Sequence, residues 1–295
     1  MSPRNVTLLV IGVIAVSFSA PLIRLADAPP LAVALYRNVF AAAVLVPLAL
    51  IRHRDELRSL AASDWAWLAL AGGFLALHFI TFIPSVTLTT VAASTVLVST
   101  SAVFAAAGGK VLFGDSARRS TIVGLVIALI GAGLISGGDF RASTRAFLGD
   151  ILALSGAVLV AGYFLTGRSL RRRLSLLVYA GIVYSICAVI LAVAVLLSGT
   201  PLTGYEPKVW LLFGLMALGP QILGHTTFNF LLRDVSATVI AVAVMAEPVG
   251  ASLLALLFFG ETPSAIDVIG GLMVLVGIYL GIVGEASRPI EAPLE

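Results

Sequence analysis

Three polar side chains recur at intervals of four residues within one apolar segment: Gln221, His225 and Asn229. Residues four apart share one face of an α-helix, so their amide and imidazole groups can act together on one solute. Polar groups inside hydrocarbon are costly and tend to face cavities. We therefore predict that this stripe lines a substrate cavity. Hydrogen bonding between neighbouring helices is the alternative use of the same groups.

A second segment combines aromatic, hydroxyl and imidazole groups on one face. His78, Thr81, Phe82 and Ser85 follow the spacing i, i+3, i+4 and i+7, which places them together on a helix. An aromatic wall provides contact area and can stack on rings or cations, while the polar groups orient one end of a bound molecule. We predict that His78, Thr81 and Phe82 line the same cavity, with a packed helix face as the alternative.

Phe18 and Tyr163 occupy similar positions in two other apolar segments. Their rings could close the same cavity at the same depth, and we include both among its predicted lining residues. For each ring taken alone, packing among apolar neighbours is the simpler explanation.

Arg37 lies inside an apolar segment, where a charged group is costly and needs a partner. At about 1.5 Å per residue, its position about seven residues into a predicted helix puts it roughly 10 Å below the outer membrane surface. The guanidinium could receive a substrate carboxylate through two parallel hydrogen bonds. Snorkelling to the outer headgroups, or pairing with an internal acid, is the alternative. We assign Arg37 to gating or coupling.

Glu247 stands at the middle of another apolar segment, where an isolated carboxylate costs several kcal/mol, so we expect it to be neutral or paired. Pro248 has no amide hydrogen and leaves the carbonyl of Val244 without its helical donor, which predicts a kink beside the acid. Our hypothesis is that Glu247 and Pro248 tune the inward-to-outward change, and that any proton coupling acts through Glu247. The alternative is a structural acid, hydrogen-bonded to Arg37 or His225.

The elements that must position these residues are long apolar runs. The 295 residues are 60% hydrophobic and 11% charged, with a mean hydropathy of +1.10, whereas an ordinary globular domain is about 25% charged. Runs of about 20 apolar residues suit a hydrocarbon core of about 30 Å, so we predict an all-α membrane protein. Its ten transmembrane helices are expected at roughly 5–25, 30–51, 65–86, 91–113, 119–137, 149–168, 175–198, 208–232, 236–259 and 264–284.

Charge and cysteine content narrow the function classes further. The net charge is only +3, and the basic residues form short clusters between apolar runs, so we infer no nucleic-acid role. Cys187 is the single cysteine, and it can form neither an internal disulfide nor a thiolate metal cluster. We find no GxxxxGK[ST] loop and no HExxH motif, and we expect no ATP site, metal or other cofactor.

Lysine and arginine are retained in cytoplasmic loops, so their distribution predicts orientation. Both termini are expected to be cytoplasmic in a bacterial-type inner membrane. The predicted cytoplasmic residues are Arg4, Arg52, Arg54, Arg58, Lys110, Arg118, Arg119, Arg168, Arg171, Arg172, Arg173, Arg233 and Arg288. The predicted outer residues are Arg24, Arg141, Arg145 and Lys208.

The sequence repeats itself at a shift of 146 residues, which divides it into units 1–140 and 141–295. The motif FGD at 113–115 falls on FGE at 259–261, and Gly12 and Arg24 precede Gly156 and Arg168 by 144 residues. A row of glycines also recurs: Gly124, Gly131 and Gly138 match Gly270, Gly277 and Gly284. We expect these rows to serve close helix packing. Each half has five helices, an odd number, so the halves must be inverted, as in many secondary transporters that bind substrate between repeats.

Both halves resemble EamA-type repeats of the drug/metabolite transporter superfamily. The resemblance is carried by HFITFIPSVTLTTVAASTVLVSTSAVFAA with LFGD in the first half, and by EPVGA, FFGE and the glycine row in the second. It implies that helices one to four and six to nine surround a central cavity, with helices five and ten peripheral. Ala102 stands where many relatives have proline, and Asp115 replaces their glutamate. Since Ser101 and Ala102 match Glu247 and Pro248, we expect one-sided gating machinery.

The predicted function is export of small amphipathic metabolites across the membrane by alternating access, with amino acids, including aromatic ones, as the expected cargo. The bilayer and a small-molecule substrate are its expected partners, and the oligomeric state is left open. Efflux of cationic drugs or quaternary ammonium compounds, with Glu247 and the aromatic rings as the site, is the rival transport function. An intramembrane enzyme using His78, His225 and Glu247 for acid–base chemistry is the rival from another class, although we predict no enzymatic activity.

Overall fold

The computed structural model of the chain describes residues 1–89, 91–115, 119–136, 144–260, 262 and 265–286. Every regular element within these ranges is a helix, which confirms the all-α prediction. The predicted positions Arg118, Gly138, Arg141, Glu261 and Arg288 lie outside the described residues. In chain order the helices are α1 (Pro3–Ser17), α2 (Ser19–Ala26), α3 (Pro30–Arg52), α4 (Arg54–Arg58), α5 (Ala62–Leu88), α6 (Val91–Ser99), α7 (Ser101–Phe113), α8 (Arg119–Ser136), α9 (Thr144–Arg171), α10 (Leu176–Ser198), α11 (Pro207–Met216), the π-helix η2 (Ala217–His225), α12 (Thr226–Leu231), α13 (Ala237–Val244), α14 (Glu247–Phe259) and α15 (Ala265–Ala286).

Eight of the described helical segments are long and apolar enough to cross a membrane. Helices α8 and α15 each contribute a shorter apolar stretch, at 119–131 and 268–280. These segments coincide with the predicted helices, so the multi-pass prediction is confirmed. Helix α4 is an addition, because the sequence predicts a loop there. Its first turn carries Asp55 and Glu56, and acidic residues at that position stabilise a helix start.

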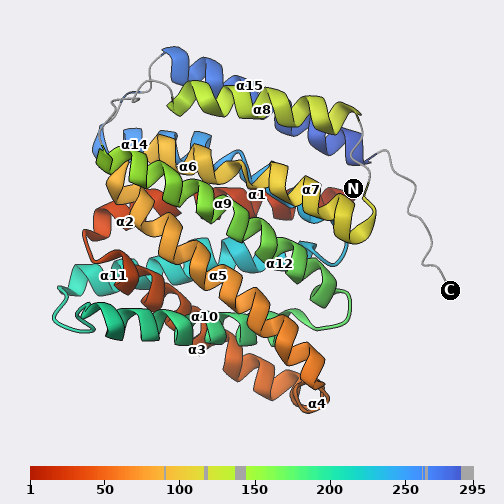
Figure 1. The fold of residues 1–295 in the computed structure, drawn as a ribbon, viewed down its shortest axis with the longest axis vertical. Coiled ribbons are helices and arrows are strands. Elements are labelled where there is room, and N and C mark those ends of the chain that lie inside the picture. Colours follow the sequence, from red (N-terminus) through yellow and green to blue (C-terminus); the bar gives the residue numbers. More distant parts are fainter. Residues whose placement is uncertain (90, 116–118, 137–143, 261, 263–264, 287–295) are drawn as a thin grey trace.

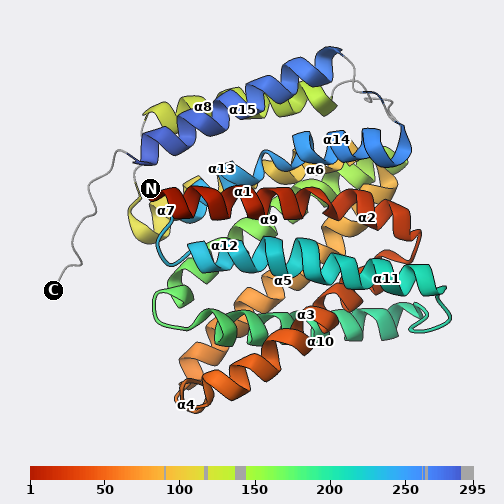
Figure 2. The ribbon, with the colours of Figure 1, turned by 180° about the vertical axis from the view of Figure 1, so that it is seen from behind.

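Helices α8 and α15 lie side by side as a layer of their own in both ribbon views (Figures 1 and 2). The other membrane-spanning segments form a bundle against this layer. A methyl group built on Gly277 would lie 2.4 Å from the carbonyl oxygen of Gly124. The two glycines therefore allow a direct approach of the helix backbones, because a side chain at Gly277 would have no room.

The first span of each repeat packs mainly on the other repeat. Helix α1 lies against η2, α12 and α14, whereas α9 lies against α5, α6 and α7. A methyl group built on Gly12 would lie 2.5 Å from a ring carbon of Phe228, and one on Gly156 would lie 3.5 Å from Cβ of Phe82. The shift of 146 residues relates Phe82 to Phe228, so the two exchanged contacts are equivalent by the internal repeat.

Two arginines fasten these exchanged helices at opposite ends of the bundle. The guanidinium of Arg168 lies 4.5 Å from the ring centroid of Phe113, and its Nη2 donates to Asp115 Oδ1 at 3.1 Å. The guanidinium of Arg24 lies 4.5 Å from the ring centroid of Phe259. The internal repeat relates these two pairs, and a cation stacked on an aromatic ring is attractive in each. Helix α9 is thereby joined to α7, and α2 to α14.

The ninth span is interrupted between α13 and α14, directly before Glu247 and Pro248, as the missing donor of Pro248 predicts. The fourth span is also interrupted, at Thr100 between α6 and α7. A break of the span is therefore present in both repeats, and the expected one-sidedness of the gating machinery stays a prediction that concerns the acid and the proline. No proline is present in this part of the first repeat, so a different cause is required.

Hydroxyl groups account for the interruption at Thr100. The Thr100 hydroxyl donates to the carbonyl of Leu97 at 2.6 Å, and the Ser99 hydroxyl donates to the carbonyl of Thr95 at 2.7 Å. Side chains that bond back to carbonyls of the preceding turn compete with the helical ladder and bend helices. The two repeats thus reach a similar break by different chemistry. The acid at the break remains specific to the second repeat, since Ser101 is its counterpart.

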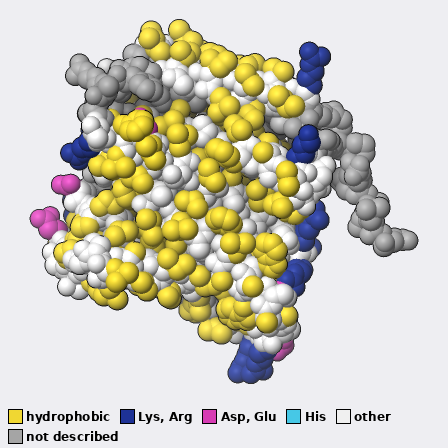
Figure 3. Space-filling model, viewed as in Figure 1, with side chains coloured by type: hydrophobic (Ala, Val, Ile, Leu, Met, Phe, Trp, Pro, Cys, Tyr) yellow, Lys and Arg dark blue, Asp and Glu magenta, His cyan; other side chains and the backbone are white. Residues whose placement is uncertain are grey.

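The membrane-facing surface is apolar, and cations gather at one end of the bundle. Figure 3 shows hydrophobic side chains across the middle of one face, and Lys and Arg side chains along its right edge. The N-terminus, α4 and the end of α7 lie at that edge in Figure 1. We call this the basic end. Its described residues are Arg4, Arg52, Arg54, Arg58, Lys110, Arg119, Arg168, Arg171, Arg172, Arg173 and Arg233.

Candidate functional site

A small cavity lies inside the bundle, between residues of both repeats. Its volume is about 30 Å³, which is room for about two water molecules. Binding of a metabolite therefore requires the surrounding helices to move apart. The lining residues are Val16, Ser19, Arg37, His78, Phe79, Phe82, Val98, Ser101, Val160, Phe164, His225, Phe228, Val244 and Glu247.

Arg37 turns into this cavity and is only 1% exposed. Its Nε donates to Gln221 Oε1 at 3.0 Å, and its Nη1 donates to Ser19 Oγ at 3.2 Å. The guanidinium also stacks on Phe79, 4.4 Å from the ring centroid. Snorkelling to the membrane surface is thus excluded as the arrangement of Arg37. Nη2 has no hydrogen-bond partner among the described residues, which leaves one charged donor for a solute.

Glu247 reaches the same cavity from the first turn of α14, with a side chain that is 7% exposed. Neither a hydrogen bond to His225 nor an ion pair with Arg37 is found for its carboxylate in the described parts of the chain. The alternative of a structural acid bonded to those residues is therefore wrong for this conformation. The Arg37 guanidinium and the Glu247 carboxyl group thus face one small cavity without touching.

Aromatic and imidazole rings complete the cavity walls between these two groups. His78 stacks on Phe82 with ring centroids 5.5 Å apart and an interplanar angle of 6°. His225 meets Phe79 edge-on at 5.8 Å and lies 6.5 Å from His78. His78 Nδ1 lies 3.0 Å from the carbonyl oxygen of Gly156, so Nδ1 carries the proton in this contact. Nδ1 of His225 has no hydrogen-bond partner among the described residues.

Of the eight residues predicted to line the cavity, His78, Phe82 and His225 do so in this conformation. Gln221 is buried beside it and positions Arg37, while its Nε2 donates to Asn38 Oδ1 at 3.3 Å. The remaining five predicted residues do not line the cavity in this conformation: Phe18, Thr81, Tyr163, Gln221 and Asn229. That they contact substrate stays a prediction.

The other four residues of that set have identifiable contacts. Thr81 donates to the carbonyls of Leu77 and His78, both at 3.0 Å. Phe18 lies at the break between α1 and α2, with its ring centroid 6.4 Å from that of Phe258. Tyr163 and Asn229 bond to each other, as described below.

The π-helix explains why Gln221, His225 and Asn229, which are spaced four residues apart, do not share one helix face. Within η2 the amide of Thr226 bonds to the carbonyl of Gln221, five residues back, and each residue of such a helix turns by less than in an α-helix. Pro220, which lacks an amide hydrogen, lies inside the same element. His225 consequently points to the cavity while Gln221 and Asn229 point into buried hydrogen bonds. Phe228 also lines the cavity, and the four-residue spacing did not predict it. The internal repeat could have predicted it, because Phe82 is the equivalent residue in the first repeat.

A buried cluster of hydroxyl and amide groups lies beside the cavity. Tyr163 donates to Asn229 Oδ1 at 2.8 Å, and Asn229 Nδ2 lies 2.6 Å from the Tyr163 hydroxyl and 3.3 Å from the Tyr184 hydroxyl. The Tyr184 hydroxyl also lies 3.0 Å from Thr226 Oγ1. Arg171 Nε donates to the carbonyl of Asn229 at 2.9 Å. The cluster connects α9, α10 and α12.

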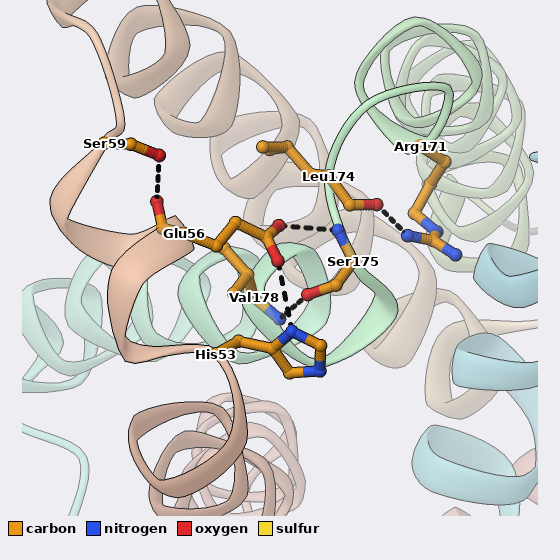
Figure 4. Close-up of polar contacts among 7 residues, drawn as sticks. All are labelled: His53, Glu56, Ser59, Arg171, Leu174, Ser175 and Val178. Carbon is orange, nitrogen blue, oxygen red and sulfur yellow. Dashed lines mark hydrogen bonds and ion pairs between the residues drawn. The ribbon is translucent and has the colours of Figure 1, made fainter.

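At the basic end, α4 is tied to the start of α10 (Figure 4). Glu56 Oε1 accepts from the backbone amide of Ser175 at 2.6 Å, and Glu56 Oε2 lies 3.2 Å from His53 Nδ1. A carboxylate at a helix start is favourable because it satisfies free amides and the helix dipole. Figure 4 also shows Arg171 bonded to the carbonyl of Leu174 in the same turn. These contacts order the connection between α9 and α10.

Comparison with protein families identifies both halves of the chain. Residues 4–137 and 147–283 match the model described as "EamA-like transporter family". A protein called "Uncharacterized transporter" from Archaeoglobus fulgidus is 24% identical over 264 residues, covering 88% of this chain and 89% of that protein. The "Uncharacterized inner membrane transporter YedA" of Escherichia coli K12 is 28% identical over 189 residues, covering 62% of this chain and 60% of that protein.

A solved structure has the same fold. It is described as "Crystal structure of protein", and it superposes with a TM-score of 0.81 at 18% sequence identity. The superposition covers 98% of this chain and 100% of the other. This likeness supports the arrangement of the helices around the cavity, independently of cargo.

Proposed function

Because the chain belongs to the EamA-like transporter family, we propose that it transports small amphipathic metabolites, above all amino acids including aromatic ones, by alternating access. The observation that carries this cargo proposal is the placement of Arg37 Nη2 and the Glu247 carboxylate on one cavity, each free of an ionic partner among the described residues. A zwitterion offers a carboxylate to the first and an ammonium group to the second.

Aromatic walls favour an apolar or aromatic portion in the same cargo. Phe82 and Phe228 lie at equivalent places in the two repeats and both line the cavity. Rings at such positions contribute buried area and edge or stacked contacts. The cavity must widen before a substrate enters, and the interruptions at Thr100 and before Glu247 are the places where α6–α7 and α13–α14 can bend.

We further propose that the basic end faces the cytoplasm and that net transport is export. Retention of lysine and arginine on the cytoplasmic side supports this orientation, which makes both termini cytoplasmic. The Escherichia coli relative is named an inner membrane transporter, which supports the same location for this chain. Proton exchange at Glu247 is the proposed source of any coupling.

A cationic cargo is the second candidate, and one observation favours it. The Glu247 carboxylate has no ionic partner among the described residues and shares its cavity with aromatic rings, which is a suitable setting for an organic cation. Arg37 on the same cavity disfavours a cargo that carries only positive charge. An amino acid satisfies both groups, so we prefer it.

We also propose that the protein is not an enzyme. His78, His225 and Glu247, the residues considered for acid–base chemistry, do share the cavity. The two histidines occupy nearly equivalent positions in the inverted repeats, which suits a pathway reached from two sides better than a single catalytic centre.

Counterflow in proteoliposomes tests the proposed cargo. Vesicles containing the purified full chain are loaded with unlabelled phenylalanine, and uptake of labelled phenylalanine, leucine and alanine is measured against protein-free vesicles. We expect uptake of labelled amino acid only with protein present. No flux with any amino acid, together with uptake of a labelled quaternary ammonium compound, would replace the first candidate by the second.

A further inference from the structure

We propose that Tyr163 and Asn229 form a hydrogen-bonded gate that closes the cavity toward the basic end of the bundle. Each side chain both donates to and accepts from the other, at 2.8 Å and 2.6 Å. Both residues are fully buried, with 0% exposure. The inference rests on the proposed alternating access, but the contact can be tested without any cargo.

The pair flanks the cavity, and Asn229 lies on its side toward the basic end. On the span formed by η2 and α12, His225 and Phe228 line the cavity, Asn229 follows directly, and Arg233 comes one turn later at the basic end. On α9, Val160 and Phe164 line the cavity with Tyr163 between them, and Arg171 ends the helix. Arg171 Nε donates to the Asn229 carbonyl, so Asn229 is also held by a residue at the basic end.

The pair also joins two groups of helices that are otherwise fastened internally. Helix α9 is held to α7 by Arg168 on Phe113 and Asp115. A methyl group on Gly108 of α7 would lie 2.4 Å from Leu165 of α9, which indicates close packing within this group.

The opposite group contains α1, η2 and α12. A methyl group on Gly224 of η2 would lie 2.6 Å from Val16 of α1, and Gly12 packs on Phe228 of α12 in the same way. Opening of the cavity toward the basic end must therefore separate α9 from α12, and the hydrogen bonds between Tyr163 and Asn229 oppose that separation.

Among the described residues, the two positions related to this pair by the internal repeat are not hydrogen-bonded to each other. The internal repeat maps Tyr163 onto Ser19 and Asn229 onto Ile83, and the Ile83 side chain can neither donate nor accept a hydrogen bond. Closure at the two ends is consequently unequal. The empty protein is expected to rest with the basic end closed, and removal of the Tyr163 hydroxyl shifts this balance toward opening there.

Thiol labelling from each side measures the gate. In a Cys187→Ala background, Val98→Cys places a reporter on the cavity wall, and a membrane-impermeant thiol reagent is applied to vesicles of each orientation. One hydrogen bond changes an equilibrium by a factor of about 2 to 13. We expect Tyr163→Phe to raise the labelling rate from the basic end by about that factor.

Tyr36→Phe is the matched control, since the Tyr36 hydroxyl donates to the carbonyl of Leu202 in the connection beyond α10, away from the basic end. We expect it to leave labelling from the basic end unchanged. Asn229→Leu removes the same bond from the other side, and combined with Tyr163→Phe it should add little to the larger single effect, because the two residues act as one contact.

An unchanged rate from the basic end in folded Tyr163→Phe would overturn the gate. If that variant does not fold, the same result in Asn229→Leu overturns it. Increased labelling in a protein that moves no amino acid would leave the gate standing and remove the proposed cargo, so the two failures are distinguishable.

Discussion

A methyl group built on Gly131 of α8 would lie 2.5 Å from the carbonyl oxygen of Gly270 of α15. Real side-chain carbons do not approach a backbone oxygen so closely, and neither backbone can yield without moving its helix. Gly131→Leu should therefore destabilise the protein by about 1–3 kcal/mol through overpacking. Thermal unfolding in detergent measures this loss.

The chain offers a control on the same helix. No atom lies within 4 Å of a methyl group built on Gly133, so Gly133→Ala should leave the unfolding temperature unchanged or slightly higher. Cargo range is expected to be the same in both variants that fold. A changed range in a fully stable Gly131→Leu protein would place α8 in the transport pathway.

Arg37→Lys keeps the positive charge but loses the planar guanidinium that bonds to Gln221 and Ser19. A hydrogen bond to a charged group contributes about 1.5–3 kcal/mol, so we expect KM for a carboxylate cargo to rise about tenfold or more. Initial-rate counterflow measures KM. The corresponding amine, which has no carboxylate, should be affected much less; an equal effect on both would argue against a carboxylate at Arg37.

Glu247→Gln preserves shape and hydrogen-bonding capacity but removes ionisation. We expect the flux of the unaltered protein to vary with pH and the flux of Glu247→Gln to lose that variation, because a proton bound at Glu247 is the proposed coupling species. Proteoliposome flux between pH 5 and 9 checks this. Glu206→Gln, in an exposed connection, is the control and should keep the original profile.

An unchanged pH profile in Glu247→Gln would leave this residue as part of the scaffold. The protein would then be an uncoupled facilitator rather than a proton antiporter. The same measurement therefore decides the transport class as well as the role of one side chain.

Orientation can be tested with exposed positions at the two ends. Cysteine replacing Arg172, in a Cys187→Ala background, should react with an impermeant reagent only from the cytoplasmic side, and cysteine replacing Arg145 only from outside. Both positions are exposed, so the absence of reaction reflects the side of the membrane. Reaction of the first and not the second in intact cells would invert the proposed topology.

The fold was predictable because its signals are local or repeated. Apolar runs indicated the spans, and the glycines that include Gly131 and Gly270 indicated a close helix pair. The interruption at Thr100 was not foreseen. Its hydroxyl can serve packing or bond back to Leu97, and sequence alone does not choose between those uses because the choice depends on neighbouring helices.

The site was predictable only in part, for a geometric reason. The face with His78 and Phe82 reaches the cavity because α5 is regular there. Gln221 lies inside the π-helix η2 and Asn229 lies after it, so the rotation per residue of an α-helix does not relate their side chains. Arg37 illustrates a second limit of prediction from sequence. Its position along the helix fixes the depth of its backbone in the membrane, and this depth is the same whether the side chain extends to the membrane surface or turns into the bundle.

The exchange of first spans between the repeats has a consequence for biosynthesis. Helix α1 leaves the ribosome first, yet its neighbours η2, α12 and α14 begin at Ala217 or later. About 200 residues separate Ser17 from Ala217, which corresponds to about 10 to 40 s of synthesis at about 5–20 residues per second. During that interval the first inserted helix lacks its final contacts, so lipid or an insertion factor must cover the packing face of α1 until the last quarter of the chain is synthesised.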